Sequence, residues 1–399
     1  MSESLIVEQG EFEELCAHFE SQGLVAFDTE FVSEYTYRPQ LCLLQFATKE
    51  RVAAVDPFAV HDLASWWRLM ADEETRVIVH GGQAEVRFCL DAIDQPPRNL
   101  IDLQIAEGFR GRSYPLAYKT IVPRVLGRQV HSRETRTDWR RRPLSPEQIR
   151  YAIEDVDHVL AVWERQERDL LRRGRVDWVH SECRRMIDDI ERDRAREPWE
   201  KLSGVHKLSP RELAVLRELA AWREAEADRR DRSPRQILRD DLLLELVHRQ
   251  PRSVADLAQT RDMNRKDYKR GAAELVECIE RGLAVPPDQL PRSPRPEGTS
   301  GRRDDEQVIG KLLSIALANR CAEIEIAQPL VGTAADLQHL VRWHVYKEKR
   351  GPAPRLLCGW RAEVCGDLLT DVLDGRITLR VAHPESDHPL VFERREPAR

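Results

Sequence analysis

Residues 24–31 read LVAFDTEF, a short apolar run that leads directly into Asp28 and Glu30. Side chains alternate between the two faces of a strand, so these two carboxylates share one face. Two adjacent anionic groups are costly to hold together unless a cation lies between them. On this segment alone, a strand that ends in a solvated acidic turn is the better interpretation, because such turns are common.

The sequence around this run alternates between strand-like and helix-like segments. Apolar runs typical of strands lie at 41–46, 52–55 and 77–79, and helical patterns lie around 12–19, 62–70 and 84–90. Strands and helices mixed in this order predict an α/β domain with a central sheet. After about Leu144 the strand signals stop, and 146–173 has the pattern of one long helix that ends before Gly174.

Tyr151 and Asp155 lie four residues apart within this helical pattern. That spacing puts both side chains on one helical face. A phenol that lies beside a carboxylate can orient a water molecule bound to a metal ion. The spacing alone is weak evidence for such a site.

Taken in order along the chain, these motifs resemble the DEDD exonuclease superfamily and, within it, the ribonuclease D family. Asp28 and Glu30 match the first motif, and Tyr151 with Asp155 matches the third motif in its tyrosine form. The other matching segments are 37–45, His80-Gly81-Gly82, 100–104, Thr137-Asp138-Trp139 and Arg142-Pro143-Leu144. Each piece is common, whereas their ordered combination over roughly the first half of the chain is highly specific. The resemblance implies a ribonuclease H-like, mixed-sheet exonuclease domain over residues 1–180.

The resemblance also implies the chemistry, which is hydrolysis of RNA from its 3′ end with two divalent ions, Mg²⁺ or Mn²⁺, at the scissile phosphate. The residues expected to hold these ions are Asp28, Glu30, Glu85 and Asp155. Tyr151 is expected to orient the attacking water, because a phenol with an ordinary pKa of about 10 is a poor base at neutral pH. The expected substrates are RNA 3′ ends, in particular those of transfer RNA precursors.

Glu85 departs from the family pattern, which has an aspartate five residues after the histidine of the second motif, here His80. Glutamate keeps the charge but adds a methylene, and a two-metal site depends on sub-ångström placement. Either the helix that carries Glu85 shifts back slightly or activity falls. The alternative function is therefore a nucleic-acid-binding protein with an exonuclease fold and weakened or lost catalysis.

Residues 205–288 resemble the HRDC domain, a small helical module that the family uses as an auxiliary nucleic-acid contact. A proline-rich segment, 289–305, is expected to be a flexible linker to a second all-α, HRDC-like domain at 306–385. Residues 253–257 (SVADL) match 333–337 (TAADL), and both carry the signature of a helix start, so we interpret the two domains as a divergent tandem repeat. The HRDC pairing favours RNA over a third possibility, a DNA exonuclease.

Basic residues with an aromatic among them mark two candidate nucleic-acid contacts. Arg136, Trp139 and Arg142 precede the third motif, and Lys266 and Lys269 lie in the first HRDC-like domain. Arginine forks suit phosphates, and an indole can stack on a base. The alternatives are a solvated charged loop with a packed tryptophan and a solvated helix terminus.

The composition is that of a globular chain, with 41% hydrophobic and 33% charged residues among 399. A net charge of −6 counts mildly against nucleic-acid binding, although binding depends on local patches. The eight cysteines are scattered singly, which favours buried, reduced thiols over zinc sites or disulfides. No secretory signal, membrane-spanning run or stable protein partner is evident, so we expect a cytoplasmic protein.

Overall fold

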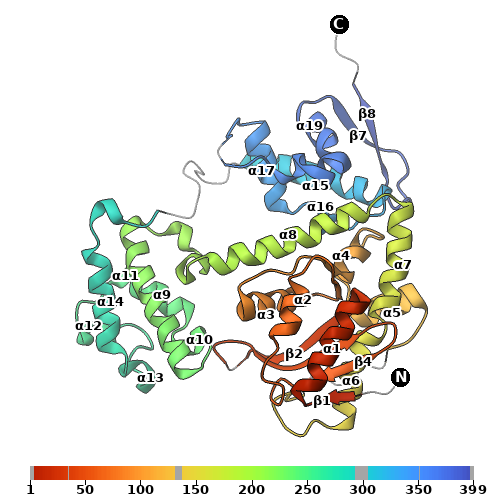
Figure 1. The fold of residues 1–399 in the computed structure, drawn as a ribbon. Helices are drawn as coiled ribbons and strands as arrows, with labels where there is room; N and C mark the ends of the chain where they lie inside the picture. Colours follow the sequence, from red (N-terminus) through yellow and green to blue (C-terminus); the bar gives the residue numbers. More distant parts are fainter. Residues whose placement is uncertain (1–3, 35, 131–136, 293–303, 350, 396–399) are drawn as a thin grey trace.

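The computed structural model describes residues 4–34, 36–130, 137–292, 304–349 and 351–395 (Figure 1). Its N-terminal part is built on a six-stranded sheet in the order β1-β4-β3-β2-β5-β6. The strands are β1 (Ser4–Ile6), β2 (Leu24–Val32), β3 (Gln40–Ala47), β4 (Val52–Val55), β5 (Arg76–Val79) and β6 (Leu100–Asp102). β3 is antiparallel to β2 and β4, whereas the other neighbours are parallel. The expected mixed-sheet α/β domain is confirmed.

The two faces of this sheet have different coverings. One face carries an aromatic cluster under α1 (Gln9–Gln22) and α2 (Ala64–Met70), which consists of Phe19, Phe27, Phe46 and Trp66. The opposite face is covered by α6 (Pro146–Asp157), whose Ala152 shares an apolar cluster with Leu43 of β3. Because side chains alternate along β2, Asp28 and Glu30 project from this second face.

The helix that the sequence predicted over 146–173 is two helices, α6 and α7 (Val159–Arg172). They break at His158, whose backbone N–H donates a hydrogen bond to the Tyr118 hydroxyl oxygen at 3.3 Å. α6 packs on β3 and β4, whereas α7 packs on α4 (Leu103–Gly108) and α5 (Tyr118–Leu126). The prediction of one continuous helix was wrong, because each half follows its own packing partners.

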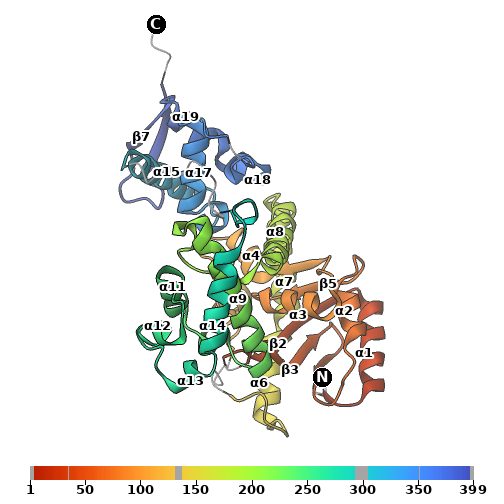
Figure 2. The same ribbon diagram turned by 90° about the vertical axis from the view of Figure 1, so that its left-hand side faces the viewer.

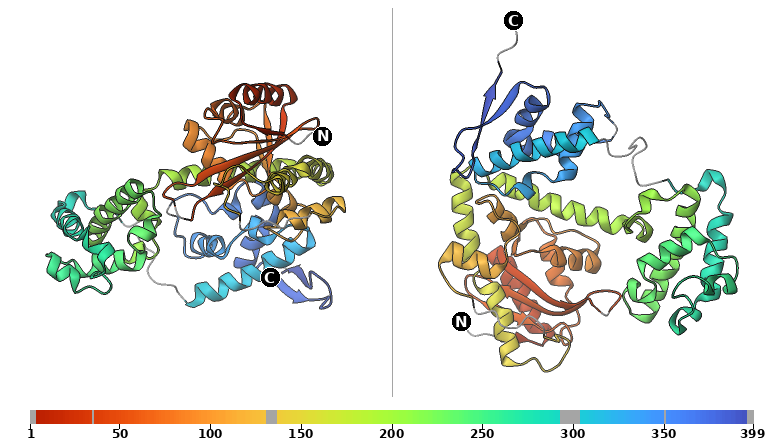
Figure 3. Two further views of the ribbon diagram at one scale, coloured as in Figure 1. Left: turned by 90° about the horizontal axis from the view of Figure 1, so that it is seen from below. Right: turned by 180° about the vertical axis from the view of Figure 1, so that it is seen from behind.

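Helix α8 (Val176–Ala195) connects the sheet-containing N-terminal domain, which we call the exonuclease domain after the family that its sequence resembles, with the rest of the chain. It packs along α3 (Gln83–Ile93), α4 and β6, and it leads to a first helical domain that lies to one side (Figures 1 and 2). A second helical domain lies on the other side of α8 from the sheet (Figure 3). The chain thus reaches its second helical domain only after passing through the first.

The first helical domain has an apolar core of its own. Its helices are α9 (Pro210–Arg230), α10 (Pro234–Ile237), α11 (Asp240–Arg249), α12 (Val254–Ala258), α13 (Lys266–Lys269) and α14 (Ala272–Ala284). Their buried side chains form one cluster that begins at Trp199 and ends at Ile279. Its described polar contacts with the exonuclease domain include a hydrogen bond from the Tyr37 backbone N–H to Asp231, at 3.0 Å. Because this contact is formed by polar groups at a loop, the apolar core of the first helical domain stays separate from that of the exonuclease domain.

The second helical domain instead shares one continuous apolar core with the exonuclease domain. Its elements are α15 (Asp304–Glu323), α16 (Gln328–Val331), α17 (Ala334–His344), α18 (Gly359–Arg361), α19 (Asp367–Leu373) and the strands β7 (Ile377–Val381) and β8 (Leu390–Arg394). Trp360 stacks on Trp178 of α8 and meets Phe109 edge-on, with ring centroids 5.5 Å and 4.9 Å apart. The antiparallel β7–β8 hairpin was not predicted from the sequence.

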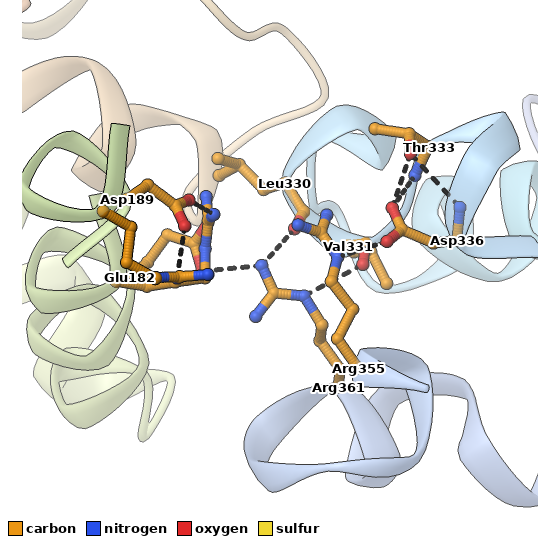
Figure 4. A network of polar contacts seen from close by, with 10 residues as sticks. Glu182, Asp189, Leu330, Val331, Thr333, Asp336, Arg355 and Arg361 are labelled. Carbon is orange, nitrogen blue, oxygen red and sulfur yellow. Dashed lines mark hydrogen bonds and ion pairs between the residues drawn. The ribbon is translucent and has the colours of Figure 1, made fainter. Parts of the chain in front are cut away.

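A buried ion pair completes the docking of the second helical domain (Figure 4). The Arg361 guanidinium donates to the Glu182 carboxylate of α8 at 2.6 Å and to the Leu330 and Val331 carbonyl oxygens at 2.7 and 3.0 Å. Arg361 and Glu182 are both buried, and Glu182 is the carboxylate that balances the Arg361 charge, while its other oxygen accepts from Arg185. The pair therefore ties α18 to α8.

Three smaller features also follow from the sequence. Ser253 and Thr333 cap α12 and α17 by accepting the backbone N–H groups of Asp256 and Asp336. All eight cysteines are free thiols, and all but Cys358 are buried. Among the described residues, no helix combines the length and the apolar character needed to cross a membrane.

Candidate active site

Four carboxylates from three elements lie within electrostatic reach of one another beside β2. Asp28 and Glu30 come from β2, Asp155 from α6 and Glu85 from the first turn of α3. Burial raises the pKa of Asp28 well above its ordinary value, and repulsion from Glu85, Asp155 and Glu30 raises it further. Burial, followed by Asp155 and Glu85, raises the pKa of Glu30 to about 8. The structure thus brings all four predicted carboxylates into one electrostatically coupled group.

Tyr151 is joined to this group through Asp155. The two side chains are hydrogen-bonded across one turn of α6, with the phenol as the donor. Burial raises the pKa of Asp155 to about 7, although the Tyr151 hydrogen bond opposes the shift. Burial, Asp155 and Glu30 raise the pKa of Tyr151 above its ordinary value, so the phenol stays protonated at neutral pH. The start of α6 is fixed by a capping box between Ser145 and Gln148.

Glu85 approaches the group from the far face of β2. Its side chain is buried, and one carboxylate oxygen accepts a hydrogen bond from the Thr29 hydroxyl at 2.5 Å. Thr29 projects from the opposite face to its neighbours Asp28 and Glu30. Burial raises the pKa of Glu85, whereas the Thr29 hydrogen bond lowers it. The longer side chain at this position is therefore held against Thr29 rather than left free.

Asp102, which the sequence analysis did not select, fixes the turn that leads to Glu85. Its buried carboxylate accepts the backbone N–H groups of Gly81 and Gly82, each at 3.1 Å, and that of Gln104 at 2.8 Å. One side chain thus joins the start of α3 to the start of α4. The signal in the sequence was weak, because Asp102 stands within an apolar run.

Tyr118 is a second residue that the sequence analysis missed. Its ring meets the His80 ring edge-on, with centroids 5.5 Å apart, and its hydroxyl accepts the His158 N–H at the end of α6. Burial and the nearby charges of Asp155, Asp157 and Asp28 raise its pKa. Tyr118 therefore lies beside the carboxylates and holds the helix end next to Asp155.

The predicted nucleic-acid contacts before the third motif have mostly structural surroundings. Trp139 is buried in the apolar cluster that contains Leu43 and Ala152, which leaves little of its ring for stacking on a base. Arg142 donates to both carboxylate oxygens of Asp56, at 2.6 and 2.8 Å, and to the Cys42 carbonyl oxygen at 2.7 Å. The packed alternative therefore describes this tryptophan better, and Arg142 fixes the loop to the sheet.

The other predicted contacts lie elsewhere. Lys269 is exposed at the end of α13, as a nucleic-acid contact would require. Lys266 begins the same short helix. Arg136 lies outside the described residues.

The donor set fits divalent cations. All four carboxylates offer hard oxygen ligands, which Mg²⁺ and Mn²⁺ prefer, and a bound cation would relieve their mutual repulsion. Across the described ranges, no three acidic, histidine or cysteine side chains are already arranged around one point as a metal-binding cluster. Glu85, in particular, is turned towards Thr29.

Comparison with known proteins agrees with this arrangement. The family model described as 3′-5′ exonuclease matches residues 5–170, and the HRDC domain model matches 212–279. The chain is 34% identical to ribonuclease D of Gluconacetobacter diazotrophicus, over 90% of each chain. It is 30% identical to ribonuclease D of Nitrobacter hamburgensis, over 94% of this chain and 97% of the relative. The chain belongs to the ribonuclease D family.

A solved member of the ribonuclease D family has the same architecture. The crystal structure of Escherichia coli RNase D, titled an exoribonuclease involved in structured RNA processing, matches with a TM-score of 0.80 and 26% identity. The match covers 94% of this chain and 99% of the other, so it includes both helical domains. A Bifidobacterium adolescentis protein, 20% identical with a TM-score of 0.67, shares the fold. The expected class of enzyme, a 3′-5′ exoribonuclease of the ribonuclease D type, is confirmed at this level.

Proposed function

We propose that this protein shortens RNA from the 3′ end by metal-dependent phosphodiester hydrolysis, that it acts in the cytoplasm, and that transfer RNA precursors are among its substrates. The observation that carries the proposal is the convergence of Asp28, Glu30, Glu85 and Asp155 with Tyr151 on a ribonuclease D fold. The named substrate extends to this chain the role of the Escherichia coli relative in structured RNA processing.

Each residue has a distinct role in this proposal. Asp28, Glu30, Glu85 and Asp155 hold two divalent ions, Mg²⁺ or Mn²⁺. When bound, such ions lower the pKa of the attacking water and stabilise the leaving 3′ oxygen. Tyr151 stays protonated and positions the water, and its hydrogen bond to Asp155 keeps the phenol in place. Tyr118 holds the end of α6, close to Asp155, through its hydrogen bond with the His158 backbone N–H.

Glu85 decides between this proposal and its alternative. Its Oε1 accepts from the Thr29 hydroxyl, so a cation is held either by the other oxygen, Oε2, or by Oε1 after the carboxylate turns towards Asp28. If neither arrangement is reached at low cost, the chain binds RNA with weakened or lost catalysis. The hydrogen bond between Glu85 and Thr29 is the observation that favours this second function.

The first helical domain supplies the auxiliary RNA contact in this proposal. Lys269 is exposed there, and Lys266 begins the same helix, α13. Arg136 stays a predicted contact on the exonuclease side. An exposed lysine such as Lys269 contributes salt-dependent affinity for phosphates without selecting a sequence.

The experiment is an exonuclease assay on a transfer RNA with a 3′ extension and on a DNA strand of the same sequence. Substrates labelled at the 5′ end show the direction, because shortening from the 3′ end gives a ladder of labelled products. We expect RNA shortening with Mg²⁺ or Mn²⁺, none with a chelator, and a loss of several orders of magnitude in Asp28→Ala. RNA binding without metal-dependent shortening would support the binding function instead. Equal or faster DNA shortening would contradict the RNA assignment.

A further inference from the structure

Gln45 is a buried glutamine whose amide lacks a hydrogen-bond partner among the described residues. It lies on β3 with an exposed fraction of 0%, and both side-chain atoms, Nε2 and Oε1, are unpaired. Burying an amide in this way is unfavourable, and buried polar side chains are almost always paired. An aliphatic side chain of similar size would give a more stable sheet, so the amide requires a functional explanation.

The pairing of the strands places the Gln45 amide next to Asp28. Gln45 lies directly opposite Asp28 of β2 on one side and Ala54 of β4 on the other. Directly opposed residues project from the same face of a sheet, with Cβ atoms about 4.5–5.5 Å apart. Asp28 is therefore the polar one of the two cross-strand neighbours of Gln45, and a glutamine side chain is long enough to reach it.

The chemistry of the two groups is complementary. The Asp28 carboxylate accepts a hydrogen bond from the Thr29 backbone N–H, and an ionised carboxylate has about four acceptor positions. It can therefore accept an amide hydrogen and bind a cation at the same time. A neutral amide suits this place better than lysine or arginine, because it donates a hydrogen bond without adding a positive charge that repels a metal ion.

We propose that Gln45 is a positioning residue for Asp28, and that its Nε2 group donates a hydrogen bond to the Asp28 carboxylate when that carboxylate binds a divalent cation. The inference rests on the proposed function, because it assigns Asp28 to the cation site. Side chains that hydrogen-bond metal ligands from behind fix the orientation of the ligand and raise metal affinity. In the absence of the cation, the unpaired amide lowers the free energy of unfolding. The protein keeps this amide because the metal site uses it.

The test compares Gln45→Leu and Gln45→Met with the parent protein. Both changes remove the amide and keep a side chain of similar size. We expect the melting temperature without metal to stay the same or rise, because an unpaired polar group is gone. We expect the affinity for Mn²⁺ alone, measured by titration calorimetry, to fall about tenfold. The single-turnover rate on RNA should fall while the KM for RNA changes little.

Gln166→Met is the matched control. Gln166 is equally buried, but its amide is used structurally, since Nε2 donates to the Leu103 carbonyl oxygen at 3.2 Å and to the Glu107 carboxylate at 3.0 Å. Its removal should lower the melting temperature and leave the affinity for Mn²⁺ unchanged. The two glutamines should therefore have opposite effects on stability and on metal binding.

Several outcomes overturn the inference. The inference is wrong if a folded Gln45 variant binds Mn²⁺ with an affinity within twofold of the parent. It is also wrong if the affinity falls together with a decrease in melting temperature as large as that of the control. If Gln45→Leu does not fold, Gln45→Met decides by the same criteria, and failure of both makes the amide a structural requirement. A parent that does not bind Mn²⁺ also overturns it. A parent that binds Mn²⁺ without shortening RNA contradicts the proposed function, whereas the titration still tests Gln45.

Discussion

The two helical domains are attached to the exonuclease domain in opposite ways. The first keeps its own apolar core and meets the exonuclease domain through polar groups at a loop, such as Tyr37 with Asp231. The second has no separate core in the described residues, because its buried side chains continue into those of the exonuclease domain. A domain that is recognised from its sequence pattern therefore need not fold or unfold independently. We expect calorimetry to resolve two unfolding transitions rather than three.

The largest expected effect comes from breaking the buried ion pair between Arg361 and Glu182. Arg361→Ala leaves Oε2 of the buried Glu182 carboxylate without its donor, while Arg185 still pairs with Oε1, so we expect a loss of about 3 kcal/mol, the lower end of the range for breaking a buried pair. The transition that contains the exonuclease domain should move to lower temperature. Arg223→Ala is the control, because Arg223 is also buried but pairs with Asp240 inside the first helical domain. It should lower only the other transition, and a fall of both transitions in either variant would contradict the comparison.

A smaller loss is expected from overfilling the shared core at Gly108. A Cβ atom there would lie 2.5 Å from Leu330 of the second helical domain, which is too close without a shift. Gly108→Ala should therefore cost about 1–3 kcal/mol in the same transition as Arg361→Ala. Gly10→Ala is the control, because a Cβ atom at Gly10 would have no other atom within 4 Å. Gly127 is not suitable as a control, because its positive φ would add backbone strain. Chemical denaturation of the three proteins would measure the difference.

The pH dependence of stability separates the two transitions further. In the folded protein the pKa values of Glu30 and Asp155 are about 8 and about 7, above their values of about 4.3 and 3.9 in an unfolded chain. The folded state therefore binds more protons between these limits, so the metal-free protein should become more stable as the pH falls from about 8 to about 5. Mn²⁺ should reverse this trend, because a cation favours the ionised carboxylates. Melting curves across this range should show the effect in the exonuclease transition, and a shift confined to the other transition would contradict it.

The smallest effect on stability is expected at the loop contact. The Arg38 and Asp228 side chains are 3.9 Å apart and mostly exposed, and such pairs contribute less than about 1 kcal/mol. Arg38→Ala combined with Asp231→Gly should therefore leave both melting temperatures nearly unchanged, and glycine is chosen because residue 231 has a positive φ. We expect the variant to change the affinity for long RNA rather than for short RNA, because the first helical domain would lose its fixed orientation. Binding assays with RNAs of two lengths would show this, and a large fall in either melting temperature would mean that the contact is structural.

The sequence predicted the parts of the fold that depend on local patterns. Short apolar runs marked the strands, and the S/T-x-x-D signatures marked the starts of α12 and α17. The break at His158 could not be predicted, because the apolar periodicity continues through it and the different packing partners of α6 and α7 come from distant segments. The sequence also could not predict that the exonuclease domain and the second helical domain share one core, because this depends on which apolar surfaces of the two domains pack against each other.

The candidate site was predictable where charges stand out and unpredictable where polar residues stand within apolar runs. The four carboxylates and Tyr151 carry a recognisable spacing. Asp102 and Gln45 lie in segments that match the family, but the local pattern does not mark either side chain, because the groups that each one faces come from other segments of the chain. For Trp139 and Arg142 the sequence pattern was misleading, because their residue types are typical of nucleic-acid contacts. In the structure Trp139 packs in an apolar cluster, and Arg142 fixes a loop by its ion pair with Asp56.

The continuous core has a consequence for how this chain can be divided. α8 ends at Ala195 and α15 begins at Asp304, so the segments that build one core are separated by the whole first helical domain. In the order of the chain, the first helical domain interrupts a discontinuous unit, and such an arrangement is tolerated because the cost of closing a longer loop grows slowly. Truncation after the first helical domain would expose Phe109 and Trp178 and favour aggregation. The smallest stable exonuclease should instead be obtained by excising the first helical domain and rejoining its flanks.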